Sequence, residues 1–358
     1  MDKEIRVGIR ADGGTKMGAG HLFRCMSIAH GFKKMGVSVL FYVADEDGAS
    51  VLSREGMESK VLHTDYANLE AEADTLVREL EEDGICLLLV DSYFTTPHYL
   101  KRLNQVCPVF CLDDEGKEDR VMPVSGIINY NILGAQMPYA NYWWVQKEKP
   151  LLLLGSEYAP VRPSFLETKH CPKPDRKKLM ITMGGSDQFN IAGKLVKRLL
   201  LCDIQHLDIE LICGGFNPYL KELQTLAENH ANLSVAWDVR DMWNHMAQSD
   251  LVVAAASSTM YELCAIGVPT VCCFYVENQR AIAEGFEKRT KVSNCGNFAE
   301  EEETVLSNLV REISRLLEDE KERKAVADSM RKVCDGRGAE RLARRLISYA
   351  EERYAETE

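Results

Sequence analysis

The strongest constraint on the fold of this 358-residue chain is an alternation of apolar strand patterns with amphipathic helix patterns, which occurs twice. Continuous apolar strands separated by helices are typical of a parallel sheet whose two faces are both covered. In the first half, the predicted strands are 5–10, 37–44, 59–63, 85–91 and 108–112, with helices at 21–35, 68–83 and 96–105. In the second half, they are 178–183, 207–213, 232–237, 250–254 and 269–275, with a helix at 191–201. The pattern predicts the α/β class, with two doubly wound, Rossmann-like parallel-sheet domains.

The boundary between the two halves is predicted over 156–177, which contains four prolines and no clear periodicity. We therefore expect an N-terminal domain over 1–155, a linker over 156–177 and a C-terminal domain over 178–358 with a charged helical tail. Ligands of doubly wound sheets bind beyond the carboxyl ends of the strands. A ligand is accordingly expected in a cleft where the two domains face one another.

Charge and hydropathy exclude several classes of partner. The formal net charge of -12 argues against nucleic acid or an anionic membrane, because both require basic patches. No apolar stretch approaches the roughly 18 residues that span a bilayer. The charged start of the sequence runs directly into a strand and shows no signal-peptide pattern. These features predict a small-molecule ligand, no nucleic acid and no membrane partner; the oligomeric state is not indicated.

The twelve cysteines do not form a pattern typical of a metal site or a disulfide framework. Most lie inside apolar runs, as Cys86, Cys213, Cys272 and Cys273 do, and no C-x-x-C pair occurs. Buried reduced thiols behave as small hydrophobic side chains. The sequence therefore predicts no metal ion, no cofactor and a reducing, cytoplasmic compartment.

A glycine-bearing turn that includes Gly18, Gly20 and His21 lies between the first strand and the first helix. Such a turn directs backbone N–H groups and the positive end of a helix dipole at a ligand, which is usually a phosphate. A titratable imidazole beside a phosphate site suggests catalysis. The alternative is a tight turn whose histidine only caps the helix, and the motif alone does not decide between the two.

The second half carries two further strand-to-helix turns. Gly185 and Ser186 follow the strand at 178–183, and Ser258 and Thr259 follow the strand at 250–254. Serine and threonine at helix starts either cap the helix or leave N–H groups free for a phosphate. Glu262 closes a capping box or accepts the hydroxyl groups of a ribose, and the two roles can coexist.

Polar side chains also follow other predicted strands. Asn278 and Gln279 come after the strand at 269–275, where amides read sugar hydroxyls or cap a surface helix. Asp91 ends a strongly apolar strand, so its carboxylate is solvated, paired or functional. Asp113 and Asp114 follow the next strand, but no further ligands at recognisable spacing support a metal site there.

Taken in order and spacing, these segments resemble the UDP-2,4-diacetamido-2,4,6-trideoxy-β-L-altropyranose hydrolase family of pseudaminic acid biosynthesis. That family is related to the lipid-linked peptidoglycan GlcNAc transferase, which has the B-type glycosyltransferase fold. The resemblance covers most of the chain and rests on the segments 10–12, 18–25, 91–93, 112–114, 153–165, 183–187, 258–262 and 278–279. Two segments depart from the family pattern: Ala19 replaces a threonine, and Ala256-Ser257 replaces a glycine pair. Both departures concern the phosphate contacts or the sugar accepted.

The resemblance implies metal-independent hydrolysis of a UDP-diacetamido-trideoxyhexose at the anomeric C–O bond, giving UDP and the free sugar. It makes His21 the base that activates water. The residues implied to bind the sugar part are Asp12, Gly18, Gly20, Arg24, Tyr93, Asn278 and Gln279. Those implied to bind UDP are Gly185, Ser186, Ser258, Thr259 and Glu262.

Two other functions remain open. A glycosyltransferase would use the same nucleotide site with an acceptor hydroxyl in place of water. Lipid-linked acceptors usually require an apolar and basic membrane face, for which the only candidate is 142–145, and an aromatic core segment explains that stretch better. A non-catalytic nucleotide-sugar-binding partner would not need the histidine, so His21 argues against it.

Overall fold

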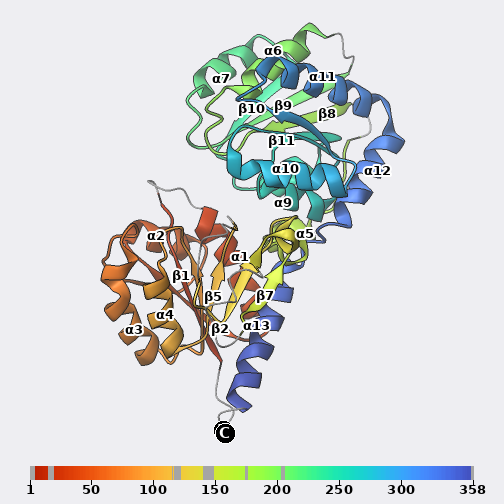
Figure 1. Ribbon diagram of the computed structural model, residues 1–358. Helices are drawn as coiled ribbons and strands as arrows, with labels where there is room; N and C mark the ends of the chain where they lie inside the picture. Colours follow the sequence, from red (N-terminus) through yellow and green to blue (C-terminus); the bar gives the residue numbers. More distant parts are fainter. Residues whose placement is uncertain are drawn as a thin grey trace. The chain divides into compact units, whose positions relative to one another are not determined.

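The computed structural model describes residues 5–14, 20–114, 116, 122–139, 149–173, 176–202 and 206–355. The chain divides into two compact units (Figure 1). Unit 1 comprises Met1–Pro163 together with Arg337–Glu358, and unit 2 comprises Ser164–Gly336. Gly18 and the aromatic segment 142–145 lie outside the described residues. No helix in the described part of the chain is long and apolar enough to cross a membrane.

Unit 1 contains a seven-stranded sheet in the order β3-β2-β1-β4-β5-β6-β7, and every pairing is parallel. Its strands are β1 (Arg6–Ala11), β2 (Ser38–Val43), β3 (Ser59–Val61), β4 (Leu87–Asp91), β5 (Val109–Leu112), β6 (Gly126–Asn129) and β7 (Leu151–Leu154). Its helices are α1 (Gly20–Lys34), α2 (Glu46–Arg54), α3 (Ala73–Glu82), α4 (Pro97–Val106) and α13 (Gly338–Ala355), with short turns η1 (Leu69–Glu72), η2 (Gly134–Gln136) and η4 (Ser156–Tyr158).

Both faces of this sheet are buried, which explains the continuous apolar runs of its strands. Leu87 and Leu89 of β4 pack in one core cluster with residues of α1 and α13. Leu88 and Val90 of the same strand pack in a second cluster with residues of α3 and α4. Successive side chains of a strand point to opposite faces, so both sets of side chains are mostly apolar in a strand covered on both sides.

Unit 2 contains a six-stranded sheet in the order β10-β9-β8-β11-β12-β13, again parallel throughout. Its strands are β8 (Lys177–Thr182), β9 (Leu207–Cys213), β10 (Leu233–Trp237), β11 (Leu251–Ala255), β12 (Thr270–Phe274) and β13 (Ser293–Asn297). Its helices are α6 (Ile191–Leu201), α7 (Leu220–Glu228), α8 (Met242–Ala247), α9 (Thr259–Ile266), α10 (Glu277–Arg289), α11 (Glu302–Glu318) and α12 (Glu320–Arg331); the short α5 (Pro163–Glu167) begins at the boundary. The predicted class of two doubly wound parallel sheets is confirmed.

Each sheet has one point where the chain direction along the sheet reverses. In unit 1 this point lies between β1 and β4, because the chain proceeds from β1 outward to β2 and from β4 outward to β5. In unit 2 it lies between β8 and β11 for the same reason. Crevices form at the carboxyl ends of strands at such switch points, and ligands of open α/β sheets bind there.

The predicted assignment of the C-terminal tail to the second domain is wrong. Helix α13 packs against α1, and Leu342, Ala343 and Leu346 are fully buried in the core of unit 1. The approach is close at Gly31 of α1, where an added Cβ would lie 2.6 Å from the carbonyl oxygen of Ala339. The prediction used only the position of the tail in the chain, whereas the apolar side chains of α13 pack against α1 of unit 1.

The first crossing between the units falls between Pro163 and Ser164, inside the segment 156–177. This segment is not an extended linker throughout, because it includes η4 and α5. The second crossing, at Gly336, was not anticipated from the sequence.

Candidate functional site

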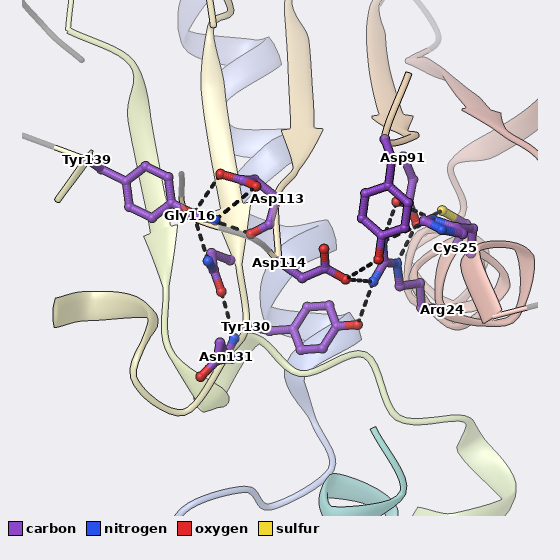
Figure 2. A network of polar contacts seen from close by, with 12 residues as sticks. Arg24, Cys25, Asp91, Asp113, Asp114, Gly116, Tyr130, Asn131 and Tyr139 are labelled. Carbon is purple, nitrogen blue, oxygen red and sulfur yellow. Dashed lines mark hydrogen bonds and ion pairs between the residues drawn. The ribbon is translucent and has the colours of Figure 1, made fainter. Parts of the chain in front are cut away.

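Polar side chains from four places in unit 1 converge beyond the carboxyl ends of its strands (Figure 2). The site lies at the switch point of the sheet, since α1 follows β1 and Asp91 is the last residue of β4. Asp114 follows β5, and Tyr130 follows β6. Parallel strands bring these positions to one edge, although they are up to 106 residues apart in sequence.

His21 lies in the first turn of α1, and its Nδ1 is 2.7 Å from Oδ1 of Asp91. Asp91 is buried, and burial opposes its charge, but the guanidinium of Arg24 and the bond from His21 hold the pKa of this carboxyl well below its usual range. An ionised carboxylate only accepts hydrogen bonds, so Nδ1 carries the proton. The lone pair of a neutral His21 imidazole is therefore on Nε2, which is the arrangement of a general base oriented by a carboxylate.

Arg24 binds Asp91 at two points, with Nε 2.5 Å from Oδ2 and Nη2 2.5 Å from Oδ1. Its Nη1 donates to Oδ2 of Asp114 at 2.6 Å and to the hydroxyl of Tyr130 at 3.1 Å. Burial opposes the charge of Arg24, yet the charge of Asp91 raises its pKa well above the ordinary value. Nη2 also lies 3.0 Å from Nδ1 of His21, but both groups are donors in this tautomer. The guanidinium predicted to bind sugar is thus engaged by three groups of the protein.

Tyr93 covers the imidazole from the side. Its ring meets that of His21 edge to face, with ring centroids 4.8 Å apart and an interplanar angle of 80°. Its hydroxyl donates to Oδ2 of Asp114 at 3.1 Å. Burial of the phenol and the nearby charge of Asp114 raise the pKa of Tyr93, so the hydroxyl stays a neutral donor. The side chain is half exposed and can contact a ligand beside His21.

Asp12 lies in a different environment. Its Oδ1 accepts from the N–H of Ala44 at 2.8 Å, and its Oδ2 accepts from Arg10 at 2.5 Å. Arg10 is fully buried and also binds Glu72 at two points. Burial raises the pKa of Asp12, and Arg10 opposes that rise. These contacts give Asp12 a core-stabilising role at the end of β1, and direct contact with sugar stays a prediction. Gly20 begins α1 and borders open space, because an added Cβ there meets no atom within 4 Å.

In unit 2, the turn after β8 is built closely against the loop after β9. Gly184 adopts φ 81°, and a Cβ at Gly214 would lie 2.4 Å from Cα of Gly185. Both glycines are therefore required by the backbone. Gly185 itself borders open space, since nothing lies within 4 Å of an added Cβ.

The start of α6 is already capped by a carboxylate. Asp187 accepts from the N–H of Ile191 at 2.8 Å and from the N–H of Ala192 at 3.0 Å. Burial raises the pKa of Asp187 to about 6, although these two bonds oppose the rise. The expected phosphate contact of this turn therefore falls on Gly185 and Ser186 and not on the first N–H groups of α6.

Helix α9 begins beyond β11, the neighbour of β8 in the sheet. Ser258 is its N-cap residue and makes no side-chain capping hydrogen bond, while Ser257 Oγ accepts weakly from the N–H of Thr259 at 3.4 Å. Thr259 is the first helical residue, and Glu262 lies in the first turn. The switch point of unit 2 thus brings together the strand ends that carry the two predicted UDP-binding turns.

Asn278 and Gln279 lie in the first turn of α10, after β12. The side-chain oxygen of Gln279 accepts from the N–H of Tyr275 at 3.1 Å, so one half of this amide stabilises the loop. Asn278 is exposed. The hydroxyl of Tyr275 donates to the carbonyl of Met183 at 3.0 Å and links this loop to the turn after β8.

The described residues include all twelve cysteines; none of them forms a disulfide, and ten are buried. Within the described ranges, no group of three or more His, Cys, Asp or Glu side chains is arranged to hold a metal ion. Sequence reasoning missed the pairing of His21 with Asp91, the contacts of Asp114 and the capping role of Asp187. The signal for Asp91 was present, because a carboxylate ends a fully apolar strand.

No protein-family model matches the chain. Among curated proteins, it is 22% identical over 306 residues to the uncharacterized protein MJ1062 of Methanocaldococcus jannaschii, covering 83% of this chain but only 61% of that relative. It is 24% identical over 342 residues to the spore coat polysaccharide biosynthesis protein SpsG of Bacillus subtilis, covering 94% and 96% of the two chains. It is 23% identical over 287 residues to the UDP-2,4-diacetamido-2,4,6-trideoxy-β-L-altropyranose hydrolase of Campylobacter jejuni, covering 80% and 97%.

Solved structures share the fold at low identity. MurG of Acinetobacter baumannii matches with a TM-score of 0.63 and 13% identity, covering 96% of this chain and 99% of that one. A putative UDP-N-acetylglucosamine 2-epimerase of Listeria monocytogenes matches with a TM-score of 0.68 and 13% identity, covering 98% of each chain. The chain is therefore a distant relative of the Campylobacter altropyranose hydrolase and of SpsG, built on the two-sheet, B-type glycosyltransferase fold found in MurG.

Proposed function

We propose that this protein hydrolyses a UDP-sugar at the anomeric C–O bond, with a UDP-diacetamido-trideoxyhexose as substrate. The observation that carries the proposal is the bond between Nδ1 of His21 and the buried carboxylate of Asp91. It leaves Nε2 of a neutral imidazole as a base at the switch point of the sheet. The named activity of the Campylobacter relative supports the same chemistry.

In the proposed reaction, Nε2 of His21 takes a proton from a water molecule, and the water oxygen bonds to the anomeric carbon. The C–O bond to the diphosphate breaks, and UDP leaves with the electron pair. A diphosphate is a good leaving group that needs hydrogen-bond donors more than a general acid. We assign those donors to unit 2, at Gly185, Ser186, Ser258 and Thr259.

The sugar part of the site is assigned to both units. In unit 1, Tyr93 lies beside His21, and in unit 2 Asn278 is exposed at the start of α10. Glu262 is assigned to the ribose, because a carboxylate in the first turn of a helix can accept two hydroxyl groups.

The second candidate is a UDP-sugar-dependent glycosyltransferase of the same fold, favoured by the likeness to MurG. It would use the same base to deprotonate an acceptor hydroxyl. The two candidate functions differ in whether water reacts with the UDP-sugar, because a transferase excludes water and so prevents hydrolysis of its donor.

The deciding experiment incubates the protein with UDP-diacetamido sugars in the absence of any acceptor and follows free sugar and UDP by NMR. A hydrolase releases both rapidly, and His21→Asn reduces turnover by about 10²–10⁴-fold. The matched control is His98→Asn, a surface histidine of α4, which should retain activity. Release that is negligible alone and rises sharply with an added acceptor would show a transferase instead.

A further inference from the structure

We propose that Asp114 is a positioning residue that supplies the countercharge for His21 when the imidazole takes a proton from water. The catalytic part of this proposal rests on the proposed hydrolysis. In this proposal, Arg24 and Asp91 fix the orientation of the His21 imidazole. Asp114 sets the net charge of the side chains around it.

Several charged and titratable side chains of the described residues approach His21. One is Tyr93, after β4, whose ring meets the imidazole. The others are labelled in Figure 2: Arg24 of α1, Asp91 of β4, Asp114 after β5 and Tyr130 after β6. Both tyrosines stay neutral, since burial raises the pKa of each. Among the residues that the structure describes, the charges that remain in these contacts are those of one guanidinium and two carboxylates.

The sum of these charges gives Asp114 its role. Arg24 binds Asp91 at two points, so one positive and one negative charge compensate each other directly. With His21 neutral, Asp114 leaves the cluster one negative charge in excess. Proton uptake by His21 then brings the cluster to neutrality. Without Asp114, the resting cluster would be neutral, and the same uptake would create a net positive charge in a largely buried site.

The contacts of Asp114 show how it acts at a distance from the base. Its Oδ2 accepts from both Arg24 and the hydroxyl of Tyr93, so it reaches His21 through two intermediaries. Its side chain is 32% exposed, whereas that of Asp91 is 1% exposed. A position that tolerates water can lose its charge without losing the fold, which makes Asp114 open to substitution in a way that Asp91 is not.

A merely structural role would be to anchor Tyr93 against the imidazole. Asp114→Asn distinguishes the two roles, because the amide oxygen can still accept from Tyr93 while the charge is lost. Asp114→Glu restores the charge at the cost of one extra methylene. The charge role therefore predicts loss in the first variant and recovery in the second, whereas anchoring predicts retention in the first.

The test uses the full chain with ¹³C- and ¹⁵N-labelled histidine, and the His21 resonance is identified by its absence in His21→Asn. In Asp114→Asn, the pH at which His21 takes up a proton should fall by about one unit, as expected for loss of a nearby opposite charge. With substrate, kcat should fall about tenfold with little change in KM, and the acid limb of the kcat/KM profile should shift in the same direction.

Asp74→Asn is the matched control, because it removes an equal charge from the exposed surface of α3. It should leave the His21 titration and turnover unchanged, and Asp114→Glu should restore both. If Asp114→Asn does not fold, Asp114→Ser replaces it. An unchanged titration of His21 in a folded Asp114→Asn protein overturns the proposal whether or not hydrolysis is observed. A shifted titration in a protein without hydrolytic activity instead retains the charge assignment and overturns the proposed function.

Discussion

At the scale of single residues, Asp91 connects several side chains of the unit 1 site. One buried carboxylate accepts from His21 and at two points from Arg24, and the thiol of Cys25 lies 3.5 Å from it. A buried carboxylate without such partners would be strongly destabilising. The interaction therefore serves two purposes, because the groups that make burial of the charge possible also fix the tautomer of the imidazole.

Asp91→Asn is expected to reduce both stability and turnover. The amide can place its NH₂ group toward His21 or Arg24, and Arg24 loses a partner inside a largely buried site. Breaking a buried pair costs about 3–5 kcal/mol, and the retained bond to Asp114 lowers this to roughly 2–3 kcal/mol. Urea unfolding of parent and variant at pH 7, 5 and 3 measures the difference.

The sign of the pH dependence of the difference in unfolding free energy between parent and Asp91→Asn follows from the pKa of Asp91. The pKa of Asp91 is lower in the folded protein than in the unfolded chain, so its contribution is complete above the unfolded value of about 4. It is lost only as the pH falls toward the much lower folded value. The gap between parent and variant should therefore be smaller at pH 3 than at pH 5. A gap that widens from pH 5 to pH 3 would contradict the assignment.

Part of this site could be predicted from residues alone. The glycine turn with His21 and the rim carboxylate Asp91 follow from local patterns. The ion pair between Arg24 and Asp114 does not, because it joins residues 90 positions apart and depends on the order of the strands. The same holds for Asp12, where sequence similarity implies sugar binding but Arg10 and Ala44 occupy both carboxylate oxygens.

At the scale of elements, α6 is capped by an acid whose charge is only partly compensated. Asp187 is 1% exposed and adopts φ 42°, and burial raises its pKa to about 6. Two backbone N–H groups favour the ionised form, yet desolvation outweighs them. The cap therefore depends on pH in a way that an exposed aspartate at a helix start does not.

Asp187→Asn should flatten the pH dependence of stability between about pH 4 and pH 6. In the parent, the folded state binds more protons than the unfolded state across this window, so stability falls as the pH rises. A shift of about two units corresponds to at most about 3 kcal/mol. The asparagine keeps an oxygen to cap α6, so the variant should equal or exceed the parent at pH 7. Urea midpoints at pH 4.5, 5.5 and 6.5 test this, and parallel curves for the two proteins would refute it.

Most strands could be predicted, and three were missed. The strands of both sheet centres lie within two residues of their predicted starts, since burial on both faces imposes a continuous apolar run. β13, at the edge of its sheet, has the sequence Ser-Asn-Cys-Gly-Asn and no apolar run to detect. β6 and β7 lie on the same outer side of the first sheet. Their length of four residues does not explain why they were missed, because β3 and β5 are no longer and were predicted.

At the scale of the whole molecule, the proposed catalytic and UDP-binding roles are assigned to different switch points, one in each sheet. Unit 1 carries the proposed base at β1 and β4, and unit 2 carries the proposed UDP-binding turns at β8 and β11. UDP affinity and catalysis should therefore be separable by substitution. Glu262→Ala should weaken UDP binding by about tenfold or more, the loss expected for hydrogen bonds to a charged group, whereas His21→Asn should leave it unchanged.

Isothermal titration with UDP measures both variants on the full chain. The matched control is Glu284→Ala on α10, an exposed acid that should bind UDP like the parent. UDP affinity in Glu262→Ala equal to that of the parent would remove Glu262 from the proposed site. A large loss in His21→Asn would show that the nucleotide is not confined to unit 2.

The chain completes unit 1 only after it has built unit 2, because Ser164–Gly336 lies between the two parts of unit 1. Helix α13 thus contributes core that no other segment can replace, with Leu342 and Leu346 fully buried beside α1. Leu346→Ala should lower the stability of unit 1 by about 2–5 kcal/mol, the cost of a buried leucine and the cavity it leaves.

A chain that ends at Gly336 lacks α13 and should lose more stability in unit 1 than Leu346→Ala does. Without α13, the face of α1 that it covers is open to water, so α1, β1 and β2 should lose protection in amide hydrogen exchange measured by mass spectrometry. The strands of unit 2 should retain their protection, because α13 belongs to unit 1. Leu201→Ala, which changes an exposed leucine of α6, is the control for substitution alone. Full protection of α1 in the shortened chain would show that α13 does not complete unit 1, and loss of protection in both units would show that they unfold as one.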